Sequence, residues 1–342
     1  MSTATAVDPA IHKKHPVLAL APGLALTIGI TLVAYALRLI PGVDKFSPMI
    51  LVILIGALIH NTVGNIPGTG AGVTFSLKRI LRLAIMLIGL QITAQQAAEV
   101  GVHGLAIVAI GLVGTLAATI FMGRLMGIRS GLALLIAVGT SICGASAIVA
   151  AKAATGGEDD DAAYAVAGVT LFGTIAMFLY PALKGVLHLS DPAFGLWAGS
   201  SVHEVAQAVF ASSQGGHEAL YIGTIAKLTR VAMMAPVIIL LGEVYSRLGL
   251  GGEGERGRPP FPWFLIGFLA MSALNSLVTI PHDIKAPVTA ATTFLLSMAM
   301  AAMGLHTNLR HVFSAGVKPL ALGLFASAFI SLTALILIKL TM

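Results

Sequence analysis

Charged residues are scarce in this chain: Asp, Glu, Lys and Arg make up 10% of its 342 residues, whereas 57% are hydrophobic. Soluble domains of ordinary composition carry about 25% charged residues. Apolar runs long enough to cross a bilayer, which takes about 20 helical residues, recur along the chain with only short polar breaks. The sequence therefore predicts an all-α polytopic membrane protein without a soluble domain.

Cysteine is nearly absent as well. The single Cys143 excludes an internal disulfide and any metal site built from several cysteines. We interpret this residue as a small packing residue. The sequence contains no phosphate-binding glycine loop, no His-Glu zinc motif and no nucleophile elbow. We therefore expect no enzymatic activity, no cofactor, no metal and no nucleic acid partner.

The apolar runs predict about nine full transmembrane helices, at residues 16–39, 47–63, 80–95, 102–123, 162–183, 218–245, 261–280, 288–306 and 318–340. Two further apolar elements, residues 130–152 and 194–212, are interrupted in their middles by glycine and polar residues. Residues 1–15 form a predicted cytoplasmic tail, and 16–342 a single transmembrane transporter domain. By the positive-inside rule the amino terminus lies in the cytoplasm and the carboxyl terminus outside.

Two weak internal repeats are present. Residues 83–107 align without gaps on 298–322 and pair Gly89 with Gly304. In the second repeat, "VGTSICGASAIVAA" aligns with "AGSSVHEVAQAVFA", so the two interrupted elements match each other. Such self-similarity is the sequence mark of a duplicated transporter fold.

The number of crossings decides the orientation of the repeats. If both interrupted elements crossed the membrane, one repeat would be parallel and the other inverted. If both are re-entrant hairpins, each entering and leaving on one face, both repeats are inverted. We therefore expect two broken or re-entrant elements that enter from opposite faces and meet tip to tip.

A helix broken inside the bilayer leaves backbone groups unpaired, which is tolerated only where protein or water surrounds them. The half-helix that follows a break presents free N–H groups and a partial positive charge, which suits an anion. We interpret Thr140, Ser141, Gly144, Ser200 and Ser201 as substrate-binding residues. In the alternative reading the hydroxyls bond their own helix and the glycine only aids packing.

Lys227 and Arg230 lie three residues apart on one face of a predicted span, where cations usually face a partner or a pathway. They form either the electropositive wall of an anion site or a structural ion pair, with Glu204 as the proposed partner. His203 and Glu204 are candidates for coupling or gating, because histidine titrates near neutral pH. Alternatively, the pair satisfies backbone groups at the break.

Asn61 and Asn275 stand at matched positions, each shortly before an "IP" dipeptide. They either line the cavity or cap the ends of their helices.

Several strings together resemble one known family: "LIGLQIT", "GTSICGASAI", "GTIAMFLYP", "AGSSVHEVAQAVFA", "AKLTRV" and "AMAAMGLHTNL". The family comprises the YeiH-like bacterial inner-membrane proteins, for which a role as sulfate exporters has been proposed. The resemblance extends from about residue 17 over essentially the whole chain. It implies a multi-pass inner-membrane protein of the superfamily that contains cation/proton antiporters and anion transporters.

The sequence thus favours a secondary transporter, an exporter, that moves a small anion such as sulfate or an organic sulfonate by alternating access. Its partners would be the anion, the lipid bilayer and a proton or sodium coupling ion; homo-oligomerisation stays open. Two alternatives remain. One is a cation/proton antiporter that uses Glu204, and the other is a membrane sensor or scaffold that transports nothing.

Overall fold

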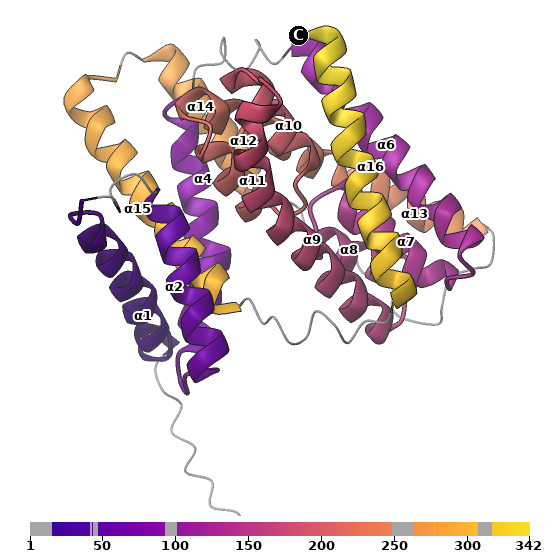
Figure 1. Ribbon diagram of the computed structural model, residues 1–342, viewed down its shortest axis with the longest axis horizontal. Coiled ribbons are helices and arrows are strands. Elements are labelled where there is room, and N and C mark those ends of the chain that lie inside the picture. The colour runs from indigo at the N-terminus through magenta and orange to yellow at the C-terminus, as the bar shows by residue number, and fades with distance from the viewer. Residues whose placement is uncertain are drawn as a thin grey trace, which may run out of the picture. The chain divides into compact units, whose positions relative to one another are not determined.

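The computed structural model describes residues 16–41, 43, 47–92, 101–247, 263–278, 280–306 and 317–342 (Figure 1). The predicted tail 1–15 lies outside these residues. Within them the chain forms helices and short connections, and no strand occurs. The chain divides into two compact units, Met1–Leu81 with Leu296–Thr307, and Arg82–Leu295 with Asn308–Met342. Each unit is described by itself.

Every predicted span corresponds to a helix in the described part of the chain. Six spans are long and apolar enough to cross a membrane: α1 (Pro16–Leu37), α6 (Gly101–Leu125), α9 (Asp159–Val186), α12 (His217–Ala232) continued by α13 (Met234–Arg247), α15 (His282–His306) and α16 (Val317–Thr341). Shorter apolar helices are α2 (Pro48–Val63) and α14 (Trp263–Leu277). The prediction of an all-α polytopic membrane protein is confirmed.

The third predicted span begins earlier than expected. Its helix consists of α3 (Gly70–Phe75), a π-helical segment at Ser76–Ile80 and α4 (Leu81–Gly89), so the start predicted at residue 80 is wrong. The apolar run is interrupted by the exposed Lys78 and Arg79, which a helix accommodates on its outer face. Backbone hydrogen bonding does not require apolar side chains, so hydropathy alone placed the start too late.

In the first unit, α1, α2, α3 and the end of α15 pack through glycines. A β-carbon built on Gly23 of α1 would lie 2.1 Å from the carbonyl oxygen of Thr69, and one built on Gly304 of α15 would lie 2.4 Å from that of Ile53. Membrane helices approach this closely only where side chains are minimal. A buried hydrogen bond of 3.0 Å between Thr27 Oγ1 and Ser76 Oγ joins α1 to the π-helical segment.

The second unit repeats one of these contacts. A β-carbon on Gly89 of α4 would lie 2.4 Å from the carbonyl oxygen of Phe268 on α14. Gly89 and Gly304 are the glycines paired by the first internal repeat. Gly304 packs on α2, which precedes the helix of Gly89, and Gly89 packs on α14, which precedes the helix of Gly304. Such an exchange of partners is expected for related halves of a duplicated fold.

Both interrupted elements are broken helices. The first consists of α7 (Ser130–Ser141) and α8 (Ala145–Thr155), which we call hairpin 1. At 1.5 Å per residue its arms are about 18 and 16 Å long, about half of a hydrocarbon core of about 30 Å. Neither arm is long enough to cross a membrane alone.

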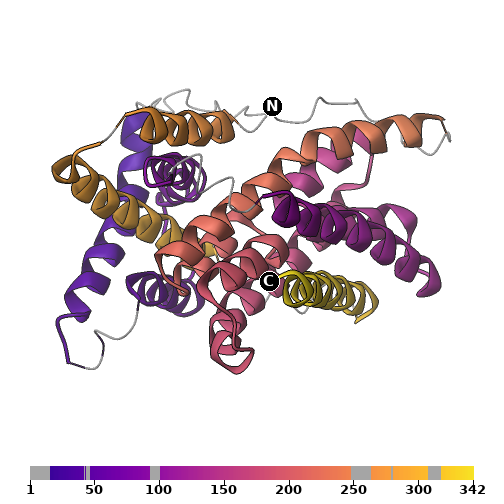
Figure 2. The ribbon, with the colours of Figure 1, turned by 90° about the horizontal axis from the view of Figure 1, so that it is seen from above.

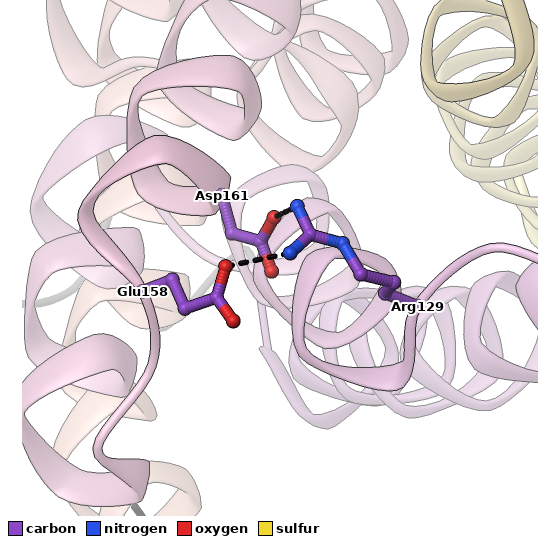
Figure 3. A network of polar contacts seen from close by, with 3 residues as sticks. All are labelled: Arg129, Glu158 and Asp161. Carbon is purple, nitrogen blue, oxygen red and sulfur yellow. Dashed lines mark hydrogen bonds and ion pairs between the residues drawn. The ribbon is translucent and has the colours of Figure 1, made fainter.

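The two feet of hairpin 1 lie together. Arg129, directly before α7, bonds Glu158 at 2.6 Å and also pairs with Asp161, and both acids follow α8 at the start of α9 (Figure 3). The hydrogen bond that Arg129 donates to Glu158 and the nearby charge of Asp161 raise the pKa of the Arg129 guanidinium above its ordinary value. Lys152 near the end of α8 pairs with Asp159 of the same segment. Hairpin 1 therefore leaves on the face from which it entered.

Hairpin 2 consists of α10 (Asp191–Ser201) and α11 (Val205–Ser213). Lys184, near the end of α9, bonds Asp191 at the start of α10 at 2.6 Å and the carbonyl oxygen of Gly215 after α11 at 3.0 Å. The feet of hairpin 2 thus meet at the opposite end of α9. Because α9 is 28 residues long, about 42 Å, the two re-entrant hairpins enter from opposite faces, as predicted.

The direction of α16 agrees independently. Lys339 near its end donates a hydrogen bond of 3.0 Å to the carbonyl oxygen of Leu187 at the end of α9. The two helices therefore end on the same face, as they do if hairpin 2 returns to its own face and the later helices each cross once. Helix α16, yellow, runs beside α6, purple, in both views (Figures 1 and 2). It also packs on hairpin 2, where Trp197 Nε1 donates to the carbonyl oxygen of Ser331 at 3.0 Å.

We predict that the hairpin feet label in pairs with a membrane-impermeant maleimide. In a Cys143→Ala background, Ser130→Cys and Asp160→Cys should react from one side of the membrane, and Gly185→Cys and His217→Cys from the other. All four positions are exposed. Labelling of right-side-out and inverted vesicles measures this; reaction of Ser130→Cys and Asp160→Cys from opposite sides would show that the first element crosses.

Candidate functional site

The breaks of the two hairpins fall at equivalent positions of the internal repeat. Helix α7 ends at Ser141 and α10 ends at Ser201, and the internal repeat aligns these two serines. In each hairpin, three residues separate the end of the first helix from the start of the second. Each first arm therefore ends in the interior with carbonyl oxygens that have no intrahelical partner. Inside a membrane such groups must be satisfied by the protein itself.

Lys227 of α12 satisfies three of these carbonyls. Its Nζ donates to the oxygen of Ile142 in hairpin 1 at 2.9 Å, to that of Val202 in hairpin 2 at 2.9 Å, and also to that of His203. An ammonium group has three N–H donors, one for each of these carbonyl oxygens. Its side chain is fully buried.

Arg230, one turn further along α12, completes the arrangement. Its Nε donates to the oxygen of Ser141 at 3.0 Å, one terminal nitrogen to that of Thr140 at 2.5 Å, and the other to that of Val202 at 3.0 Å. Arg230 is also fully buried. The two cations thus join the ends of α7 and α10, where helix dipoles concentrate negative charge.

Glycine packing sets the register that brings Lys227 to the tips. A β-carbon on Gly195 of α10 would lie 2.4 Å from the oxygen of Ala219 on α12, and one on Gly199 would lie 2.2 Å from that of Gly223. The two chain segments run in the same direction, and the two contacts are one helical turn apart on each of them. One further turn along, Lys227 lies against His203 and donates a hydrogen bond to its carbonyl oxygen.

Glu204 bonds neutral groups rather than the expected cations. Thr170 of α9 donates a hydrogen bond of 3.0 Å to its Oε1, and its backbone N–H donates to Gln207 Oε1 at 3.1 Å. Gln207 Nε2 reaches the carbonyl oxygen of Thr170 at 3.2 Å. The ion pairs of the described residues do not join Glu204 to Lys227 or Arg230. The interpretation of Glu204 as their ion-pair partner is therefore wrong, because backbone carbonyls occupy their donors.

The carboxylate of Glu204 lies at the start of the other hairpin's second arm. A β-carbon on Gly144 would lie 2.7 Å from Glu204 Cγ and 3.6 Å from its Oε1. Gly144 precedes α8 with a φ of 75°, a left-handed conformation in which glycine is the favoured residue. No side chain caps α8, whereas the Glu204 carboxylate caps its own helix α11 by accepting from the backbone N–H of Gln207.

His203 points away from Glu204. Its Nε2 lies 2.8 Å from Ser327 Oγ on α16, and Ser327 donates its own proton to the carbonyl oxygen of Gly323 at 2.7 Å. Nε2 therefore carries the hydrogen, because the serine can only accept from it. The second ring nitrogen, Nδ1, is buried without a hydrogen-bond partner among the described residues.

The predicted hydroxyl ligands are buried. Ser200 and Ser201 both donate to the carbonyl oxygen of Trp197 in their own helix, as the alternative reading held. Ser141 Oγ is buried and has no partner within the described part of the chain. Thr140 lines a narrow crevice between α7, α9 and α16. These four residues contribute two of the backbone carbonyls that hold Arg230.

Accessible surface at the tips lies on the side of the second arms. Glu204 and Thr170 are partly exposed, and Ser146, in the first turn of α8, is exposed. Ser146 Oγ lies 3.0 Å from Cys143 Sγ. A ligand that approaches the crossing of the hairpins would therefore first meet these residues.

Asn61 and Asn275 lie in different units. Asn61 Nδ2 donates to the carbonyl oxygen of Ala57 in its own helix at 2.8 Å. Asn275 Nδ2 on α14 is buried without a hydrogen-bond partner in the described residues. Neither residue is among the polar neighbours of the hairpin tips described above.

Sequence reasoning did not identify Thr170, Gln207 and Ser327, although all three bond predicted residues. The sequence does carry a signal for Gln207: the repeat aligns it with Ala147, so the second interrupted element has a polar side chain where the first has an apolar one. Thr170 is one turn from Thr174, whose Oγ1 also accepts from Gln207 Nε2 at 3.3 Å. Ser327 carries no signal, since a serine in an apolar helix is ordinary.

Among the described residues, no cluster of three or more His, Cys, Asp and Glu side chains could hold a metal ion. What they form is two opposed re-entrant hairpins, joined at their tips by two buried cations. The fold and this site define a polytopic helical membrane protein with inverted repeats.

Comparison with known proteins identifies the family. Residues 22–323 match the family profile described as "Conserved hypothetical protein 698". The chain is 38% identical over 328 residues to the UPF0324 inner membrane protein YeiH of Escherichia coli K12, covering 94% of each chain. It is 39% identical over 326 residues to a UPF0324 membrane protein of Pseudomonas aeruginosa, covering 92% of each. A Bordetella bronchiseptica relative is 39% identical over 296 residues, 83% of this chain and 91% of that one.

The chain therefore belongs to this family of YeiH-like membrane proteins, as its sequence motifs indicated.

We predict that Lys227→Met lowers the free energy of unfolding by about 3 to 5 kcal/mol, because three buried carbonyls lose their donors at once. Lys339→Met is the matched control, since Lys339 bonds one carbonyl in an exposed position; its effect should stay below about 1 kcal/mol. Denaturant titration of the purified protein in detergent measures both. Equal effects would show that the buried ammonium does not hold the hairpins together.

Proposed function

We propose that this protein is a secondary transporter of a small anion, with sulfate-like oxyanions or organic sulfonates as the substrate class. The observation that carries the proposal is the charge at the hairpin tips. Two fully buried cations, Lys227 and Arg230, stand beside one carboxylate, Glu204. Buried charge is costly unless it is compensated, so a site with surplus positive charge favours an anionic ligand.

Helix dipoles do not remove this surplus. Each helix end carries about half an elementary charge, negative at a carboxyl end and positive at an amino end. The two carboxyl ends at Ser141 and Ser201 and the two amino ends at Ala145 and Val205 cancel to a first approximation. With Glu204 ionised, the tips keep a net charge of about +1.

The anion would bind on the accessible side, at the first turn of α8. Free N–H groups after Gly144 and the hydroxyl of Ser146 would donate to its oxygens, as at other helix amino ends. In this proposal Lys227 and Arg230 act through their charge. Thr140, Ser141, Ser200 and Ser201 hold the ends of the first arms in place, and His203 with Glu204 couples or gates.

Alternating access would expose this site to each face in turn, as in other transporters with inverted repeats and broken helices. We propose a bacterial inner membrane location with the amino terminus in the cytoplasm and the carboxyl terminus outside. The feet of hairpin 1, with Arg129 and Lys152, would then be cytoplasmic, in line with the positive-inside rule.

Counterflow tests the proposal directly. Proteoliposomes loaded with unlabelled sulfate should take up labelled external sulfate, whereas protein-free liposomes should not. Lys227→Ala should abolish this uptake, and Lys339→Ala, at an exposed lysine, should leave it unchanged. Folding of both variants is checked by size exclusion. Absence of counterflow for every oxyanion and sulfonate offered would reject anion transport and favour a sensor or scaffold.

A cation/proton antiporter is the second candidate, and the hydrogen bonds of the Glu204 carboxylate to uncharged groups favour it. A carboxylate that accepts from the Thr170 hydroxyl and the Gln207 backbone N–H, without an ion-pair partner among the described residues, could bind a cation or a proton. This function predicts cation-dependent proton flux that Glu204→Gln abolishes and that does not require sulfate. Sulfate counterflow without any cation dependence would exclude it.

A further inference from the structure

We propose that the hairpin tips bind water molecules on the side that faces α6, in a buried pocket lined by hydroxyl groups and by the ring of His203. The proposal goes beyond the transport function and does not depend on it. It rests on four buried polar atoms that have no hydrogen-bond partner among the described residues: Thr115 Oγ1, Thr119 Oγ1, Ser141 Oγ and His203 Nδ1. Buried polar groups in proteins are bonded, with few exceptions, to other protein groups or to ordered water.

The two threonines of α6 differ from other buried threonines of this chain. Thr31, Thr155 and Thr224 each donate to the carbonyl oxygen four residues earlier in their own helix. Thr115 and Thr119 are fully buried and make no such bond within the described part of the chain. Both lie on the buried face of α6, which packs on α7, α10, α12 and α16. The interior beside α6 thus contains two hydroxyl groups that their own helix does not satisfy.

The packing of α6 on α16 places these threonines at the height of His203. A β-carbon built on Gly114 of α6 would lie 3.7 Å from a ring carbon of Phe329, and one built on Gly123 would lie 3.3 Å from Leu322 Cδ2. The two helices are therefore antiparallel. Both threonines lie between these glycines, and the α16 serine that bonds the His203 ring at 2.8 Å lies between the two α16 residues. The hydroxyls and the ring are thus at about the same height in the second unit.

Ser141 reaches the same height on α7. A β-carbon built on Gly123 would also lie 2.6 Å from Ala133 Cβ of α7, which is the antiparallel neighbour of α6. Ser141 is eight residues after Ala133, and Thr115 is eight residues before Gly123. Because both segments are helical, equal numbers of residues cover equal lengths. The four unsatisfied atoms are therefore carried by elements that meet at one level of α6.

The buried face of α6 also leaves space at this level. Gly111 is buried, yet a β-carbon built on it would have no neighbouring side chain within 4 Å in the described segments. At Gly123, on the same face, the corresponding distance is 2.6 Å. Gly111 is one turn from Thr115, so the open space adjoins one of the unsatisfied hydroxyls. A bound water molecule needs such space together with about two to four polar partners.

The chemistry of the four atoms selects water over an ion. His203 Nε2 carries the ring hydrogen, so Nδ1 is an acceptor and requires a donor, which an anion does not offer. A cation would lie close to two buried positive charges, because Lys227 binds the backbone of His203 and Arg230 binds that of Ser141. Repulsion between like charges is strong in an interior of low dielectric constant. A water molecule can donate to Nδ1 and also bond to the hydroxyls.

Solid-state NMR of the full chain in lipid bilayers, with isotope-labelled histidine and tryptophan, tests the pocket. Magnetisation from water protons should reach the ring of His203, whose signal is assigned by its loss in His203→Asn, and this ring should carry one hydrogen. Trp197 is the control, because its buried Nε1 donates to a carbonyl oxygen and should receive no such transfer. Absence of transfer to His203 would overturn the proposal. A ring protonated on both nitrogens would also overturn it, since Nδ1 would then be a donor for an anion.

Thr119→Val tests the pocket through stability, because it replaces a hydroxyl by a methyl group of similar size. If water is bound, the water loses a partner, so the denaturant midpoint of unfolding should fall and the transfer to His203 should weaken. Thr31→Val is the matched control, since its buried hydroxyl bonds its own helix α1; it should leave the transfer to His203 unchanged. A higher midpoint for Thr119→Val would indicate that an unsatisfied hydroxyl had been removed from a dry interior, and would overturn the proposal.

Discussion

The arrangement of the second unit depends on one interaction: two buried cations of α12 bind the carbonyl oxygens at the ends of two broken helices. Lys227 and Arg230 supply the donors that Thr140, Ser141, Ile142, Val202 and His203 would otherwise lack. Without them, five carbonyls would be unsatisfied in a hydrophobic interior. The broken helices and the cations thus require each other, because neither is tolerated there alone.

The same constraint divides the hairpin tips into two chemically different sides. The ends of the first arms, with Ser141 and Ser201, are buried and saturated by the cations. The starts of the second arms, with Ser146 and Glu204, remain accessible. Structural roles are concentrated on the first side, and the accessible groups on the second side are the ones that the proposed transport function uses.

The two hairpin tips differ in charge because the two repeats differ at one aligned position. The repeat aligns Gly144 with Glu204, so one hairpin carries a glycine where the other carries a carboxylate. The glycine leaves space next to α8, and the carboxylate of the other hairpin lies there. A duplicated fold with identical tips would have placed two acids or two glycines together. Divergence of the halves has instead produced a complementary pair.

The sequence by itself determined the helical membrane class and the breaks at "GTSICGAS" and "GSSVHE", because hydropathy and glycine placement are local properties. Crossing parity favoured a re-entrant course, and the ion pairs at the feet of the hairpins decided it. The sequence also singled out Lys227, Arg230 and Glu204, since charge inside a span is conspicuous. Only the tertiary structure decided that the cations bind carbonyls rather than Glu204, and that Thr170 does bind it. Side-chain partners depend on how neighbouring helices are aligned along their lengths. For α10 and α12, the close packing of Gly199 on Gly223 sets this alignment, and no pattern in the sequence predicts it.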